Sequence, residues 1–153
     1  IVAVLSAASG FILPEPDLEC FPGQVQSQLF LPQFSLKFRL PVPEVRRMAA
    51  YALDCCRNPK VVQPLLDATR DDIEPVRGQA AVSLGRIAAP AAYDRLVEML
   101  KDPDPKVRED VVNGLRWFGD RKAIPEIEKL RKGDPDESVR KMADRTVMEL
   151  SRK

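Results

Sequence analysis

The amino-acid sequence predicts an all-α protein, a solenoid of about three and a half helical hairpins preceded by a proline-rich extended arm. A Val-Arg pair recurs at intervals of 31, 31 and 32 residues, which is typical of stacked repeat units. Apolar residues follow each pair at helical spacing. Six of the 14 prolines lie in the first 43 residues. We therefore expect an arm over residues 1–43 and a repeat domain over residues 44–153.

The chain begins with an uncharged segment, Ile1 to Leu13. This segment is too short to span a bilayer, which needs about 20 apolar residues. It either packs on the protein itself or is the remnant of an export signal or membrane anchor, because the chain opens on Ile rather than Met. We expect a cytoplasmic protein in the first case and an exported or membrane-attached one in the second.

The rest of the arm contains a stretch from Phe34 to Leu40 in which every second residue is apolar. This pattern predicts one short strand or an extended segment, which Pro41 and Pro43 end. Helical spacing begins at Glu44. The arm is expected to cap the stack, to dock on a partner or to lead to a membrane.

Each Val-Arg pair begins a predicted helix. Counting from the Val of each pair, apolar residues recur at offsets 0, 4 and 8 and, in the first three repeats, at offset 11, which places them on one side of a helix. A second stripe at offsets 17, 20 and 23 predicts the second helix of each hairpin. Pro, Gly and Asp residues lie between the stripes, where they suit turns and helix N-termini. The last stripe ends near Leu150, which gives three full hairpins and a final helix.

The stretches Asp102 to Arg108 (DPDPKVR) and Gly119 to Pro125 (GDRKAIP) resemble the short HEAT-like repeat of the phycobilisome-lyase type. The resemblance covers about residues 43–151, over which three registers agree. It implies a right-handed α-solenoid that works by binding proteins. Lyase members attach bilin chromophores, often as paired subunits. Some members of the wider family bind iron through His-Glu pairs and act as hydroxylases.

The resemblance also implies a structural ladder, formed by the Asp of each turn between repeats and the Arg of the next Val-Arg pair. Each such Asp precedes its Arg by six residues. We expect half-buried, hydrogen-bonded pairs that set the stacking register rather than a catalytic role. The residues of this predicted ladder are Asp71, Arg77, Asp102, Arg108, Asp134 and Arg140.

Composition argues against several classes of function. Lys and Arg number 24 and Asp and Glu 23, so the formal charge of +1 provides no net field for a nucleic-acid backbone. The chain has no His, the commonest general base and metal ligand, so the iron chemistry of the hydroxylases cannot be carried over. Cys20, Cys55 and Cys56 lack C-x-x-C spacing and are expected to be inert thiols, with a disulfide only if the chain is exported. We expect no catalytic residues, metal or cofactor.

Polar residues of the second helices form the predicted partner surface, because we expect these helices on the concave side of the stack. A solvated face with incidental ion pairs is the alternative. Trp117 is a further candidate, because offset 10 lies about 100° around the helix from Phe118 at offset 11. It should be exposed unless the arm or a partner covers it. The candidates on the second helices are Gln63, Asp67, Arg70, Asp94, Arg95, Glu98, Lys101, Glu126 and Lys129.

These observations predict a protein that is not an enzyme, namely an interaction scaffold or assembly subunit that binds protein partners. Two alternatives remain. One is a subunit of a membrane-associated complex that is tethered by Ile1 to Leu13. The other is a chromophore-lyase-like accessory subunit, in which the three cysteines are the available nucleophiles.

Overall fold

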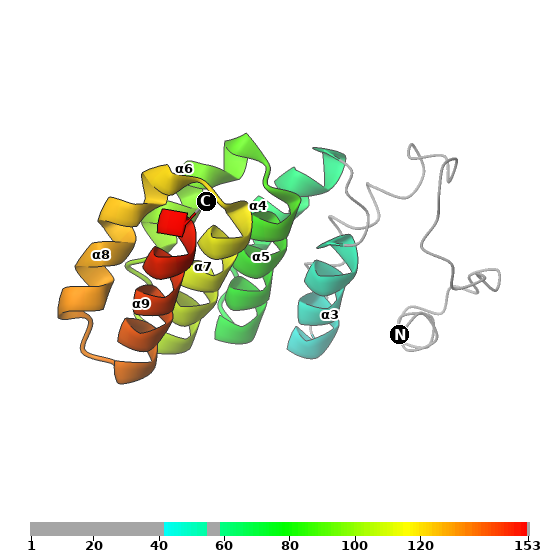
Figure 1. Cartoon of the computed structure of the whole chain (residues 1–153). Helices are drawn as coiled ribbons and strands as arrows, with labels where there is room; N and C mark the ends of the chain where they lie inside the picture. The colour runs from blue at the N-terminus through cyan, green and yellow to red at the C-terminus, as the bar shows by residue number, and fades with distance from the viewer. Residues whose placement is uncertain (1–41, 55–58, 153) are drawn as a thin grey trace, which may run out of the picture.

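A computed structural model describes residues 42–54 and 59–152, and the regular elements within these ranges are all helical (Figure 1). The predicted all-α solenoid of three and a half hairpins is confirmed. The strand or extended segment expected from Phe34 to Leu40 lies outside the described residues. The same holds for Ile1 to Leu13 and for the three cysteines.

Three hairpins follow one another, and a single helix completes the described part of the chain. The first helix of each hairpin carries the Val-Arg pair, and a short 3₁₀ turn precedes each second helix. The elements are α3 (Pro43–Asp54), η1 (Pro59–Val61), α4 (Val62–Ala68), α5 (Glu74–Ile87), η2 (Pro90–Ala92), α6 (Tyr93–Met99), α7 (Pro105–Phe118), η3 (Arg121–Ala123), α8 (Ile124–Gly133) and α9 (Glu137–Arg152).

Turn residues set where these helices begin and end. Asp104 precedes α7, and its carboxylate accepts hydrogen bonds from the backbone N–H groups of Lys106 and Val107 at 2.7 and 3.2 Å. This N-cap satisfies donors that have no partner within the helix. At the other end, α5 and α7 are followed by Ala88 and Gly119, whose φ angles of 53° and 77° are left-handed. The left-handed residue ends each helix and turns the chain toward the second helix.

The apolar stripes form one continuous core. Leu53, Leu84 and Leu115 occupy offset 8 in three successive first helices, and all three side chains are buried. At offset 11 the burial is weaker, since Phe118 is half-buried. Its ring packs against Tyr93 of the preceding hairpin, with the ring centroids 5.7 Å apart. The core therefore runs across the hairpins rather than within each one separately.

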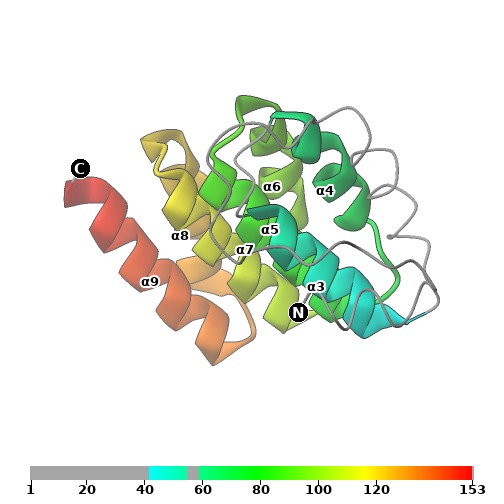
Figure 2. The same cartoon turned by 90° about the vertical axis from the view of Figure 1, so that its right-hand side faces the viewer.

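The helices form two rows. Helices α3, α5, α7 and α9 pack consecutively side by side, whereas α4, α6 and α8 form a second row that packs mainly against α5, α7 and α9 (Figures 1 and 2). The backbones of α5 and α7 approach closely where Gly85 lies against Gly114. A Cβ atom added to Gly85 would lie 2.1 Å from the carbonyl oxygen of Gly114. This approach requires a residue without a side chain.

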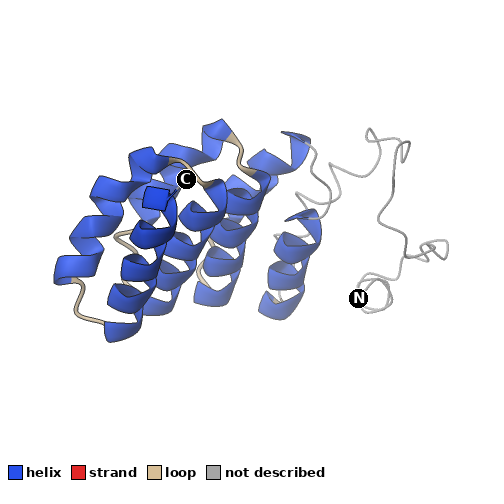
Figure 3. Ribbon diagram, in the orientation of Figure 1, coloured by secondary structure: helices blue, strands red, loops and turns tan. Residues whose placement is uncertain are grey.

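We call α3, α5, α7 and α9 the first-helix row and α4, α6 and α8 the second-helix row. Small residues of the first helices, such as Gly85 and Gly114, allow α5 and α7 to approach closely. That the second helices line the concave side of the stack stays a prediction. In the chain as described, no helix is long and apolar enough to cross a membrane. Figure 3 shows these short helices and their connecting loops.

Candidate interaction surfaces

Ion pairs between arginine and aspartate link successive hairpins at the turns between repeats. Arg77 is representative: it donates from Nε to Asp102 Oδ2 at 2.9 Å and from Nη2 to Asp102 Oδ1 at 3.0 Å. Planar, bidentate pairs of this kind are directional, so each one fixes how two neighbouring repeats stack. The pairs are Arg46–Asp71, Arg77–Asp102 and Arg108–Asp134.

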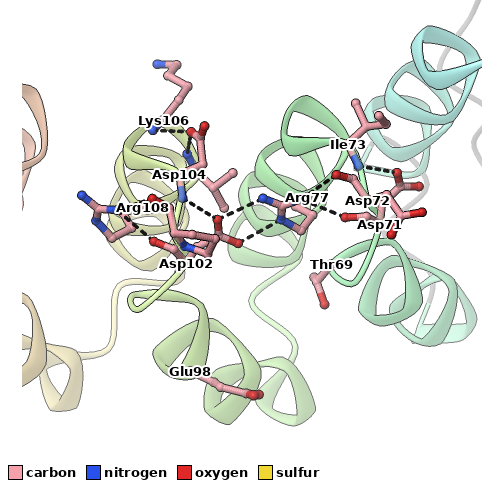
Figure 4. Close-up of polar contacts among 12 residues, drawn as sticks. Thr69, Asp71, Asp72, Ile73, Arg77, Glu98, Asp102, Asp104, Lys106 and Arg108 are labelled. Atoms are coloured by element: carbon pink, nitrogen blue, oxygen red, sulfur yellow. Dashed lines mark hydrogen bonds and ion pairs between the residues drawn. The ribbon is translucent and has the colours of Figure 1, made fainter.

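The partners in this ladder differ from those predicted. The sequence paired each Asp with the Arg six residues later, but the carboxylate accepts from the Arg of the preceding repeat, 25 or 26 residues earlier. The Arg six residues later binds the backbone instead. Arg77, for example, donates from Nη1 to the carbonyl oxygens of Asp71 and Asp72 at 2.9 and 3.1 Å (Figure 4). Arg46 therefore belongs to the ladder, and its place after Val45 is the signal that could have identified it.

Each ladder carboxylate also shapes its own turn. Asp102 Oδ1 accepts a hydrogen bond from the backbone N–H of Asp104 at 3.0 Å, and the equivalent bond recurs in the two neighbouring turns. Burial raises the pKa of Asp102, but the hydrogen bonds from Arg77 and from the Asp104 N–H together lower it by more than burial raises it. The pKa of Asp102 therefore lies below the ordinary value. The carboxylate is therefore ionised at neutral pH and holds two turns at once.

Two guanidinium groups from the first helices lie over the ring of Trp117. The Cζ atoms of Arg116 and Arg86 lie 5.0 and 5.4 Å from the centroid of its ring, within the range of cation–π interactions. Arg86 forms an ion pair with Asp54 at 2.7 Å, and Arg116 forms one with Glu149 at 3.1 Å. These five side chains connect α3, α5, α7 and α9, and we call them the Trp117 row.

The Trp117 row has the features of a protein-binding surface. The exposed fraction of Trp117 is 50%, which confirms the exposure predicted from its helical offset. A Trp with flanking Arg side chains offers apolar area and hydrogen-bond donors together, the combination enriched at binding hot spots. The sequence identified the Trp but missed its neighbours, because the ion pairs join helices about 32 residues apart.

The candidates predicted on the second helices lie on the second-helix row or directly after its helices, and the structure does not join them into one site. Arg95 donates to Thr69 Oγ1 at 2.8 Å and to the Thr69 carbonyl oxygen at 3.0 Å, and it pairs with Glu98 at 2.7 Å. It therefore ties α6 to the end of α4. The other candidates are Gln63 and Asp67, which share a hydrogen bond, Glu126 and Lys129, which form an ion pair, and Arg70, Asp94 and Lys101, which are exposed.

Comparison with known families and structures identifies this architecture. The family model of HEAT repeats matches residues 36–109 and 93–151. The chain belongs to the HEAT repeat family. The matched segments include all the described HEAT hairpins, with their ladder and the Trp117 row.

Three known proteins are similar to this HEAT repeat chain. Phycocyanobilin lyase subunit alpha of Picosynechococcus sp. is 36% identical over 84 residues, 50% of this chain and 31% of that protein. Human deoxyhypusine hydroxylase in complex with glycerol has a TM-score of 0.71 and 21% identity, covering 80% of this chain and 43% of that one. The complex of CpcE and CpcF of phycocyanin lyase from Nostoc sp. PCC7120 has a TM-score of 0.63 and 22% identity. That match covers 90% of this chain and 71% of the other chain. The two structures show the fold alone.

The lyase relative corrects one prediction and confirms another. The prediction that the chain is not an enzyme rested on the missing His, and it is contradicted because the relative is itself a lyase subunit. A subunit can serve a catalytic complex without supplying a general base of its own. The resemblance to HEAT-like repeats of the lyase type is confirmed. The chain spans about a third of the length of the relative, 31%.

Proposed function

We propose that this chain is a subunit of a chromophore-lyase-type complex, in which it holds a protein client while a bilin is joined to that client. The observation that carries the proposal is the 36% identity with phycocyanobilin lyase subunit alpha over 84 residues. A HEAT solenoid suits the role because stacked hairpins present an extended surface on which another folded protein can lie.

The Trp117 row is the surface on which we place the client. It lies on the first-helix row, where side chains from α3, α5, α7 and α9 contribute to one continuous patch. Trp117 provides the apolar anchor. Arg86 is 39% exposed at its side chain, so it retains access to a carboxylate or carbonyl group of the client.

A subunit-exchange assay tests the proposed function. The full chain replaces subunit alpha of the Picosynechococcus phycocyanobilin lyase, and the other lyase subunit, phycocyanin apoprotein and phycocyanobilin are supplied. Covalently bound bilin is measured on denaturing gels by its fluorescence. We expect an initial rate at least ten times that of the same mixture without this chain. An unchanged rate contradicts the proposed function.

Two variants test whether the Trp117 row is the client surface. Trp117→Ala should weaken binding of phycocyanin apoprotein at least fivefold, which corresponds to about 1 kcal/mol. Lys101→Ala is the matched control, because Lys101 is an exposed candidate directly after the second helix α6. It should bind like the wild type. The reverse result, in which only Lys101→Ala weakens binding, assigns the client to the second helices instead.

A further inference from the structure

A recess of about 390 Å³ lies on the first-helix row, beside the N-terminal parts of α5 and α7. Pro75, Gln79 and Val82 of α5 contribute to its lining, together with Arg47 from α3 and Asp110 from α7. Three neighbouring helices therefore form one hollow, and its volume lies within the range of about 300–1,000 Å³ that is usual for ligand pockets. Its lining contains three acidic and two basic side chains.

Asp110 is packed into this recess against a glycine. A Cβ atom on Gly78 would collide with Oδ2 of Asp110, so the carboxylate occupies space that opens only because Gly78 has no side chain. Gly78 lies within α5, where glycine is less favourable than every residue except proline. The helix therefore makes room for the carboxylate at a cost in its own stability, and such a departure from local preference is typical of functional positions.

The carboxylate of Asp110 is poorly paired. Its ion-pair partner is Lys106, whose Nζ lies 3.8 Å from Oδ1, beyond hydrogen-bond distance. Both basic side chains of the lining donate elsewhere: Lys106 to Glu109 Oε2 at 3.1 Å, and Arg47 to Glu44 Oε2 at 3.1 Å. Among the residues that the structure describes, none donates a hydrogen bond to the Asp110 carboxylate. Burial raises the pKa of Asp110 above its ordinary value, because the loss of water outweighs the attraction of Lys106.

The recess lies in line with the Trp117 row. Trp117 follows Asp110 by seven residues on α7, and Arg86 follows Val82 by four residues on α5. Both spacings keep two side chains on the same side of a helix. Seven residues correspond to about 10 Å along the helix axis. The surface on which we place the client therefore extends from an apolar anchor to a half-buried acid.

We propose that the recess receives the guanidinium group of a client arginine, which binds Asp110 while an apolar side chain of the client, about 10 Å away, contacts Trp117. A guanidinium suits a half-buried carboxylate because it is weakly hydrated and donates two parallel hydrogen bonds. The ammonium group of lysine suits it less, because that group is more strongly hydrated. The inference rests on the proposed function only for the identity of the client.

A fragment titration tests the recess without any client. Propylguanidinium represents the arginine side chain and butylammonium that of lysine, and each is added to the full chain while the amide chemical shifts of Gly78 and Asp110 are followed by NMR. We expect saturable shifts, with an affinity for propylguanidinium at least three times that for butylammonium. Asp110→Asn should abolish the shift at Gly78. Asp72→Asn is the matched control, because it removes the same charge at an exposed turn residue outside the lining, and it should bind like the wild type.

Phycocyanin apoprotein tests the same contact with a protein client. Asp110→Asn should weaken its binding at least fivefold without lowering the urea midpoint of unfolding, because the substitution removes a desolvated charge. Gly78→Ala is the second variant: its Cβ displaces the carboxylate while alanine supports the helix, so binding should weaken in the same way.

Three results would overturn the proposal: no saturable shift at either amide, equal affinities for the two fragments, or wild-type affinity of Asp110→Asn for the apoprotein. Failure of the recess and failure of the lyase role are distinguishable, because the fragment titration contains neither client nor chromophore. Bilin attachment without fragment binding rejects the arginine site alone. Fragment binding without bilin attachment rejects the lyase role alone.

Discussion

Replacing Gly85 by Ala tests whether the close approach of α5 and α7 determines the stability of the stack. An added Cβ would lie 2.1, 2.5 and 2.6 Å from the carbonyl oxygen, carbonyl carbon and Cα of Gly114. Non-bonded heavy atoms prefer about 3.5–4.0 Å, so the two helices must separate by roughly 1 Å or more. The obstacle is backbone, which cannot rotate away as a side chain can.

The expected cost follows from two opposing effects. Overpacking a close contact costs about 1–3 kcal/mol, occasionally more, and the backbone obstacle places this site at the upper end. Ala is a better helix former than Gly by about 1 kcal/mol, which offsets part of the cost. We expect Gly85→Ala to lower the free energy of unfolding by about 2 kcal/mol.

Urea denaturation of the full chain, followed by far-UV circular dichroism, measures this change. Gly133→Ala is the matched control, because no heavy atom lies within 4 Å of a Cβ at that position. Since Ala is the better helix former, this variant should leave the free energy of unfolding unchanged or raise it by up to about 1 kcal/mol. An unfolding midpoint for Gly85→Ala equal to or above that of the wild type would show that the backbone contact does not constrain the two helices.

Three further substitutions probe the core and the ladder. Leu84→Ala should cost about 2–5 kcal/mol in urea unfolding, because it opens a cavity between hairpins, and Val147→Ala in the last helix should cost less; equal costs would contradict the stacking order. Asp102→Asn should cost about 1–3 kcal/mol at neutral pH, because it leaves the Arg77 charge half-buried without a carboxylate. Since the folded pKa of Asp102 is lowered, its contribution is present above about pH 4 and is lost as the pH falls through the lower folded pKa. The stability difference between the wild type and the variant should therefore shrink as the pH falls through the acidic range, and a difference that stays constant down to acid unfolding would refute this origin.

Spacing along one helix was sufficient to predict most of the fold. The apolar stripe at offset 8 correctly placed Leu84 and Leu115 in the core, and offset 10 placed Trp117 outside it. These predictions succeed because a residue's direction on a helix depends only on its position in that helix. The turn signals succeed for a similar reason, since Asp104 caps a helix that begins at the next residue.

Contacts between repeats were harder to predict from the sequence. Asp102 lies near Arg108 in the sequence, yet its carboxylate pairs with Arg77 of the preceding repeat. Which Arg binds the carboxylate depends on how the hairpins stack, and the sequence of a single repeat does not specify this stacking. The close approach of α5 and α7 was missed for the same reason, because it depends on Gly85 of one helix lying against Gly114 of another.

The contact between Gly85 and Gly114 also determines how the solenoid can deform. In an elastic rod, bending stretches one side and compresses the other about a neutral axis of constant length. Gly85 of α5 already lies against Gly114 of α7, so the first-helix row resists compression there and places the neutral axis close to itself. Bending must then change mainly the spacing of α4, α6 and α8. We therefore expect the Trp117 row to keep its geometry when a partner flexes the stack, while the helices of the second-helix row spread or close.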